Sequence, residues 1–334
     1  MKLDIKDKKL LFLLSKNARL NIAELAKLTK LSRDVVAYRL DKLEKSGIIK
    51  GFKTGINYRL LGIKEYDIYL RLFHVNEESL AEIVNHLCEN RFVTWVGTTF
   101  GNYDVRISIL ARDNEHLNSL MLLLEKEFGN KIQDYEICPL IKKFKVHPEF
   151  LVSSIFKEIK GFKIPDKFLF RVDSSSHSPV KLDSQDRKII SILGKNCRTR
   201  LVEIASSVNM TPEGVKYKIK RLEQSGVIMH YTTAIDGPKL GKLWCVFLFK
   251  MVNMSEEKEK ALESYIANHK NATASVKIMG KWNLGLTVYA NDMREIQSLL
   301  MDFRNNFTEN VKEYDSLLIF DTFKYPALAE GALD

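Results

Sequence analysis

Apolar residues recur at helical spacing at the start of the chain and predict three helices. The first covers residues 4–17, where an apolar stripe lies opposite lysines. The second follows Asn21, which forms a capping-box pattern with Glu24 three residues later. The third runs from a Ser32 cap to Ser46, before a glycine that can end a helix. Three helices with a tight turn between the last two indicate a helix-turn-helix.

The apolar pattern then changes to period two. The segment around Gly51 and Gly55 is short alternating strand material and predicts a wing hairpin. The elements expected after it are a strand at 65–73, a helix at 77–90, two strands joined near Gly101-Asn102, a helix capped by Asn114 and ending near Phe128, and a strand at about 132–145. The order βαββαβ is ferredoxin-like. Apolar residues occupy both faces of these strands, so we expect the face without helices to be buried in a pairing.

The whole pattern returns once. Lys2-Leu3-Asp4 reappears as Lys181-Leu182-Asp183, an offset of 181 − 2 = 179 residues, and Ser46-Gly47 reappears as Ser225-Gly226. The chain is therefore a duplication, with a first and a second copy. The expected fold class is α+β, with two tandem units that each contain a winged helix-turn-helix followed by a ferredoxin-like domain. The expected domains are 1–56 (first winged helix-turn-helix), 60–147 (first ferredoxin-like, ligand-sensing and dimerisation domain), 148–180 (linker), 181–235 (second winged helix-turn-helix) and 240–326 (second ferredoxin-like domain).

Charge and cysteine content narrow the function classes. The formal net charge is +10, which favours a polyanionic partner such as nucleic acid. Acidic residues interrupt the apolar start, so we expect no signal peptide, and no apolar run reaches the length of a membrane span. Four widely spaced cysteines indicate free thiols in a reducing cytoplasm. We expect no cofactor and no metal, because the histidines lie outside metal-ligand spacing, and no nucleophile–base pair indicates an enzyme.

The third helix of each copy is the candidate DNA-reading element, because a recognition helix presents its exposed face to the major groove. Lysine and arginine there can contact phosphates or guanine, and tyrosine can reach the backbone or a thymine methyl. The simpler interpretation is a solvated helix face, but its occurrence in two matching three-helix contexts favours double-stranded DNA as the partner. The candidates are Ser32, Arg33, Ala37, Tyr38, Asp41 and Lys42 in the first copy, and Thr211, Glu213, Lys216, Tyr217, Lys220 and Arg221 in the second.

The run from Leu3 to Arg19, followed by the run from Leu40 to Phe52, resembles the Lrp/AsnC family of transcriptional regulators. The second copy resembles it from Leu182 to Tyr231. The resemblance implies that the ferredoxin-like domains are sensor domains, often called RAM domains, that pair sheet to sheet and assemble into larger oligomers. It also implies that small effectors, commonly amino acids, bind between sensor domains.

The family's GDYD-like turn matches Gly101-Asn102-Tyr103-Asp104, and the second copy has Gly280-Lys281-Trp282-Asn283 there. An amino group would prefer the Asp104 carboxylate, so we hypothesise an effector site built mainly from the first turn. Its candidate residues are Gly101, Asn102, Tyr103, Asp104, Gly280 and Trp282. The alternative is that both turns are structural, with glycine at a positive φ.

Duplication leaves two pairings open. The two sensor domains of one chain can pair with each other, which predicts an asymmetric DNA site with unlike half-sites. Alternatively, like copies pair between two chains and give a four-headed particle. The second recognition helix carries Lys216, Lys218, Lys220 and Arg221 against few acids, so we expect the second copy to supply more of the salt-dependent affinity.

Three other functions compete with a sequence-specific regulator. Sirohaem decarboxylases resemble the same pair of domains, but the histidine and arginine of their HNYxR-like stretch are missing at the matching segments 94–99 and 273–278. An architectural DNA-binding protein would also be basic and two-headed. A sensor whose heads no longer bind DNA is the third alternative, because Asp34 and Asp41 lie on the first recognition helix.

Overall fold

The computed structural model describes residues 3–146, 180–269, 271–324 and 329–333. It confirms the α+β class, but its two compact units do not follow the two copies. One unit, the head unit, contains the described parts of 1–63, 154–236 and 326–334. The other, the barrel unit, contains those of 64–153 and 237–325. Each unit is therefore assembled from both copies. The expected linker, 148–180, lies outside the described residues except for Val180.

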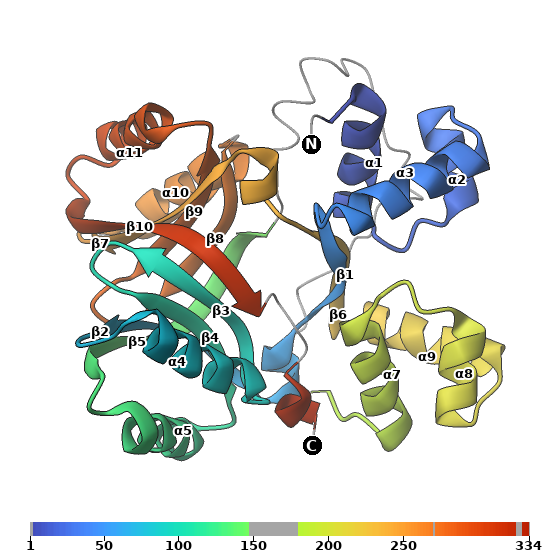
Figure 1. Cartoon of the computed structure of the whole chain (residues 1–334), viewed down its shortest axis with the longest axis horizontal. Coiled ribbons are helices and arrows are strands. Elements are labelled where there is room, and N and C mark those ends of the chain that lie inside the picture. The colour runs from blue at the N-terminus through green and yellow to red at the C-terminus, as the bar shows by residue number, and fades with distance from the viewer. Residues whose placement is uncertain (1–2, 147–179, 270, 325–328, 334) are drawn as a thin grey trace. The chain divides into compact units, whose positions relative to one another are not determined.

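The head unit has two three-helix heads, and Figure 1 shows their similar arrangement. The first head comprises α1 (Ile5–Lys16), α2 (Ile22–Thr29) and α3 (Arg33–Lys45). The second comprises α7 (Ser184–Lys195), α8 (Leu201–Val208) and α9 (Pro212–Gln224). The side chains of Asn21, Ser32 and Thr211 cap their helices as predicted. Two further capping boxes, Asp4 with Asp7 and Asp183 with Asp186, begin α1 and α7.

Matching left-handed residues make the sharp turn before each recognition helix. Lys30 follows α2 with φ 58°, and Asn209 follows α8 with φ 52°. The helix α2 ends there because a left-handed residue cannot continue it. The turn leaves α3 packed against α2 and α9 packed against α8. Both heads therefore have the helix-turn-helix geometry expected from the sequence.

The predicted wing hairpin is wrong. Gly51 and Gly55 lie within one continuous strand, β1 (Ile49–Ile56), rather than at a turn. This strand pairs antiparallel with β6 (Ile228–Ile235) of the second copy, in a sheet of two strands. A strand that pairs with its own duplicate shows the same local alternation as one arm of a hairpin, so its partner could not be read from the local sequence.

The barrel unit is a closed barrel with strand order β10-β3-β4-β2-β5-β8-β9-β7. Its strands are β2 (Lys64–Leu72), β3 (Val93–Phe100), β4 (Val105–Ala111), β5 (Ile132–Val146), β7 (Leu243–Met251), β8 (Ala272–Ile278), β9 (Leu284–Ala290) and β10 (Val311–Lys324). Each copy supplies four adjacent strands, and antiparallel β5–β8 and β3–β10 pairs close the barrel. The two ferredoxin-like domains thus pair within the chain.

Each four-stranded sheet carries two helices, namely α4 (Glu77–Glu89) and α5 (Asn114–Phe128) on the first, and α10 (Glu256–Asn268) and α11 (Met293–Asn306) on the second (Figure 1). One apolar core per copy lies between sheet and helices. The opposite sheet face is also buried, as at Tyr69 and Leu248, which are both 0% exposed. One detail differs from expectation: Asp113, not Asn114, caps α5.

Short 3-10 helices complete the described chain at Tyr58–Leu61, Pro238–Leu240 and Glu330–Leu333. The last of these packs on α7, where the Leu333 carbonyl accepts a hydrogen bond of 2.7 Å from Arg187. Among the described helices, none is long and apolar enough to cross a membrane.

Candidate nucleic-acid interface

The predicted DNA-reading residues lie on the outer faces of α3 and α9. Tyr38 is 67% exposed and its counterpart Tyr217 is 70% exposed, although large aromatic side chains are usually buried. The remaining candidates are also exposed, except for the half-buried Ala37. Each head therefore presents a central tyrosine surrounded by polar side chains, which suits contact with a DNA backbone and base edges.

Ion pairs to the first helix of each head hold the recognition helices in place. Arg39 of α3 contacts Asp4 at 2.8 Å and Asp7 at 2.6 Å. Its counterpart in α9, Lys218, contacts Asp183 at 2.5 Å and Asp186 at 3.1 Å. These cations therefore point toward the head's interior rather than toward a ligand.

This arrangement corrects the charge count made from the sequence. Lys218 is only 8% exposed, and Arg221 forms an ion pair with the fully buried Asp186. The cations of α9 that remain exposed, with no ion pair among the described residues, are Lys216 and Lys220. The basic surplus of the second recognition surface is real but smaller than the sequence suggested.

The equivalent surface of α3 is more balanced. Ala37 stands where α9 has Lys216, and Asp41 stands where it has Lys220. Asp41 also pairs with Lys45 at 2.8 Å. The two heads thus share a backbone arrangement but differ in charge at two outward-facing positions of the recognition helix.

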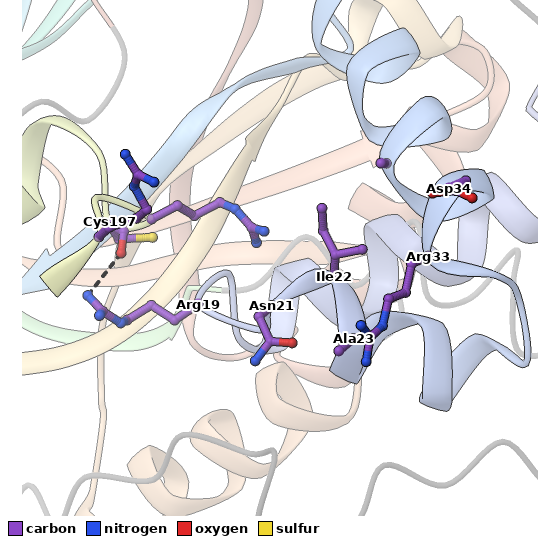
Figure 2. A pocket seen from close by; sticks show the side chains of 10 residues that line it. Arg19, Asn21, Ile22, Ala23, Arg33, Asp34 and Cys197 are labelled. Atoms are coloured by element: carbon purple, nitrogen blue, oxygen red, sulfur yellow. Dashed lines mark hydrogen bonds between the residues drawn. The ribbon is translucent and has the colours of Figure 1, made fainter. Parts of the chain in front are cut away.

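A hollow of about 610 Å³ lies beside the first recognition helix, where the two heads meet (Figure 2). Reciprocal arginine contacts form the junction: Arg19 donates to the carbonyl oxygen of Cys197 at 3.0 Å, and Arg198 donates to those of Ala18 and Leu20 at 2.7 and 2.8 Å. Burial lowers the pKa of Arg198, and the positive charge of Arg19 lowers it further. The lining residues are Arg19, Asn21, Ile22, Ala23, Arg33, Asp34, Ala37, Cys197, Arg198 and Arg200.

The hollow extends the candidate interface beyond the predicted residues. Arg33, Asp34 and Ala37 belong to the reading face of α3, so a ligand on that face would meet the junction arginines as well. These arginines were not among the residues predicted from the sequence. Their signal was available, because Arg19 and Arg198 are related by the repeat offset, but only the pairing of the heads brings them together.

The candidate effector residues form structural contacts in the barrel. The Asp104 carboxylate accepts a hydrogen bond of 2.7 Å from the Leu72 N–H, and the Asn283 side chain accepts the equivalent bond of 2.6 Å from Met251. A carboxylate at one turn and an amide at the other therefore accept the same backbone hydrogen bond. Gly101 and Gly280 have φ of 149° and 131°, in the region that favours glycine.

Tyr103 and Trp282, the counterparts at the two turns, meet across the copies. The indole N–H of Trp282 donates to the Tyr103 hydroxyl at 3.3 Å, and both side chains are almost fully buried. Asn102 donates to Asp315 of the second copy at 2.9 Å. These contacts support the structural role for both turns, and effector binding there stays a prediction.

Comparison with known proteins agrees with this geometry. A family model described as winged helix-turn-helix DNA-binding matches residues 3–50 and 182–229. An uncharacterised HTH-type transcriptional regulator of Pyrococcus furiosus is 30% identical over 151 residues, which cover 44% of this chain and 100% of that protein. LrpB of Bacillus subtilis, named as an HTH-type transcriptional regulator, is 26% identical over 42% of this chain and 99% of its own length. The regulatory protein AsnC of Haemophilus influenzae is 26% identical over 36% of this chain and 79% of its own length.

The chain belongs to the Lrp/AsnC family of helix-turn-helix transcriptional regulators. One copy of the duplicated unit spans nearly the whole of such a relative, so this member carries two Lrp/AsnC units in one chain. The siroheme decarboxylase NirDL has a similar fold along the whole chain, with a TM-score of 0.62 over 98% of this chain and 96% of that one, at 16% identity. That similarity concerns the fold alone.

Proposed function

We propose that this Lrp/AsnC protein is a sequence-specific DNA-binding regulator in which one chain presents two unlike reading heads. The observation that carries the proposal is the difference between the exposed faces of α3 and α9, with Ala37 and Asp41 replaced by Lys216 and Lys220. Because side chains at these positions reach base edges or phosphates, two heads that differ there favour different half-sites. The chain acts in the cytoplasm, and association of several chains through the outer surfaces of the barrel unit is part of the proposal.

Selection of bound duplexes from a random pool by the full chain tests this function. We expect an asymmetric motif with two unlike half-sites about one helical turn apart. Enrichment of a palindrome would contradict unlike heads. Tight binding without enrichment would identify an architectural protein instead, because specific binding requires a large ratio over non-specific binding.

The salt dependence of binding tests how the two heads divide the phosphate contacts. Each neutralised phosphate adds about 0.9 to the slope of log K against log salt. We expect Lys216→Ala with Lys220→Ala to lower the slope more than Arg33→Ala with Lys42→Ala, because Asp34 and Asp41 partly offset the first surface. Equal slopes, or a larger loss from the first head, would contradict this division.

Effector control is the finer part of the proposal. A related fold has been solved as a transcriptional regulator with L-Met from Neisseria meningitidis, and the effector of this chain is proposed to be of the same class, an amino acid. Its site would include Asp104 and the neighbouring turn residues. Amino acids are screened for a shift in Tm of the full chain, and Asp104→Asn, which copies the second turn, should remove the shift while keeping the bond to Leu72. A shift that survives Asp104→Asn would place the effector elsewhere.

The enzyme alternative rests on the fold shared with NirDL. The segments 94–99 and 273–278 form most of strands β3 and β8, and they contain neither histidine nor arginine. A decarboxylase would need such residues to donate a proton and to bind the substrate carboxylates. The regulator therefore remains the function that the chain's own residues support best.

A further inference from the structure

The two copies meet through three strand pairs: β1 with β6 in the head unit, and β3 with β10 and β5 with β8 in the barrel unit. Since an offset of 179 relates the copies, each contact between them has a counterpart at matching positions. A pair of two first copies, or of two second copies, would use the same positions with different residues. The structure therefore allows the three possible pairings to be compared contact by contact.

In the head unit, Gly55 of β1 lies opposite His230 of β6. A Cβ atom on Gly55 would stand 2.2 Å from the imidazole Cε1 atom, so the ring occupies the space of a missing side chain. The counterpart pair is Gly51 with Ala234. Two second copies would bring Ala234 against His230, where methyl and ring collide. Two first copies would place Gly51 against Gly55 and leave no side chain to pack at this position.

In the barrel unit, Gly97 of β3 lies opposite Thr322 of β10. A Cβ atom there would stand 2.8 Å from the carbonyl oxygen of Asp321, a backbone atom that cannot rotate away. The counterpart of Gly97 is Val276, which lies opposite Lys143 of β5. A pair of two second copies would put Val276 against the Asp321 carbonyl. Strand β10 therefore fits β3 of the first copy and conflicts with β8 of a second copy.

An aromatic contact between the copies is also absent from its counterpart position. Trp95 meets Trp244 with 5.9 Å between ring centroids, whereas the counterparts of these two residues are Ala274 and Glu65. Two first copies would bring each Trp95 beside a Glu65 carboxylate in the buried contact. Two second copies would leave the space of an indole ring beside each Ala274, and such a cavity destabilises a packed interior.

Buried polar groups show the same dependence on pairing. Trp282 donates to the Tyr103 hydroxyl, so two Trp282 residues would bring together two donors and no acceptor. The Arg106 guanidinium, whose side chain is 15% exposed, pairs with Asp67 at 2.9 Å and lies over the Trp95 ring. Its counterpart is Gly285. Two first copies would double this bulky charged group inside the barrel, and two second copies would remove it.

One contact favours a different pairing. The register places Lys142 opposite Lys277, although each lysine forms its own ion pair, with Glu263 and Glu259 respectively. Two second copies would place Asp321 opposite Lys277. Exposed ion pairs contribute little, whereas a conflict with the Asp321 carbonyl and the loss of packed aromatic contacts are costly, so the packing contacts decide.

We propose that the two copies of this chain are complementary to each other and not to themselves. The barrel and the β1–β6 sheet are then closed between unlike copies, and a further chain can associate only through outer surfaces. This inference goes beyond the proposed function, because it holds whether or not the heads bind DNA. Where they do, the two heads joined through one β1–β6 sheet are always unlike, and the half-sites that they read are unlike as well.

A cut chain tests the pairing directly. A protease site is inserted in the serine-rich stretch 174–179 of the full chain, the folded protein is cut, and the two fragments are unfolded and refolded together. Native mass spectrometry then counts N-terminal and C-terminal fragments in each particle. We expect every particle to contain them in equal numbers. Particles with two N-terminal or two C-terminal fragments, near the roughly 1:2:1 proportion of random pairing, would overturn the proposal.

A substitution cycle in the uncut chain provides a second test. Gly55→Ala should lower Tm by several degrees, because its methyl group meets the His230 ring. Adding His230→Gly creates an alanine–glycine pair like that of Ala234 with Gly51 and should recover most of the loss. His230→Gly alone is the matched control. An unchanged Tm in Gly55→Ala, or no recovery in the double variant, would show that this contact does not select the partner.

Discussion

Replacing Asp186 by asparagine tests whether a buried carboxylate anchors the second recognition helix. Asp186 is 0% exposed, contacts Lys218 at 3.1 Å and pairs with Arg221. It also accepts the Asp183 N–H at 3.1 Å in the capping box of α7. Asparagine has nearly the same shape and keeps one acceptor oxygen for the cap. The substitution therefore removes the charge that ties α9 to α7 while leaving most of the packing.

The size of the stability loss depends on the contacts that Lys218 and Arg221 keep. Breaking a buried ion pair by removing one partner costs about 3–5 kcal/mol when the other charge stays buried. Lys218 keeps its contact with Asp183, whose side chain is 52% exposed, and Arg221, at 47% exposed, can be hydrated. We therefore expect a loss at or somewhat below the lower end of that range, about 2–3 kcal/mol, confined to the second head.

Amide hydrogen exchange followed by mass spectrometry resolves this loss by helix. A loss of that size should speed exchange through local opening of α7 and α9 by roughly 30- to 150-fold. The helices α1 and α3 serve as an internal reference. The matched control is Asp41→Asn, whose ion pair with Lys45 joins side chains that are 56% and 77% exposed, so we expect no measurable change in exchange. If Asp186→Asn behaved like this control, or affected both heads equally, the anchor would be refuted.

Three further predictions concern acid, backbone strain and thiols. The hydrogen bond from Lys218 lowers the pKa of Asp183 to about 2, below its ordinary 3.8. The stability that Asp183 contributes is therefore complete above about pH 4 and is lost as the pH falls through 2. Acid titration by circular dichroism should show a modest difference between wild type and Asp183→Asn, and identical curves would contradict this prediction. Lys30→Gly should stabilise the first head by up to about 1 kcal/mol in denaturant unfolding, because Lys30 is left-handed, and a loss would contradict it. Burial raises the pKa of three cysteine thiols to about 12, so a thiol reagent at neutral pH should label at most the half-buried Cys88 in the folded protein.

Local features of the fold could be predicted because their signals lie within a few residues. The caps at Asn21, Ser32 and Thr211 each combine a side-chain oxygen with a backbone N–H three residues later, and the structure contains all three bonds. The duplication was equally readable, since it needs only the comparison of the chain with itself. The order of helices and strands follows from such local signals.

Features that depend on a distant partner could not be read in this way. Strand β1 shows the alternation of a hairpin arm, and only its pairing with β6 distinguishes the two. Lys218 falls among exposed cations in the sequence of α9, yet two carboxylates of α7 make its burial favourable. The closed barrel presents the same difficulty, because nothing in the local sequence of β5 and β10 indicates that each pairs with a strand of the other copy.

The two heads share a carboxylate–cation anchor on their inward side and differ in charge on their outward side. Asp4 and Asp183 begin their first helices, Asp7 and Asp186 complete the capping boxes, and each acidic pair holds a cation of its recognition helix. These inward positions have one physical task in both copies, so the same chemistry serves both. The outward positions 37 and 41 differ in charge from 216 and 220, although the backbone that carries them is equivalent. A difference in charge at outward positions on an equivalent scaffold alters what each head contacts without altering how it folds, which is the condition for two unlike readers in one chain.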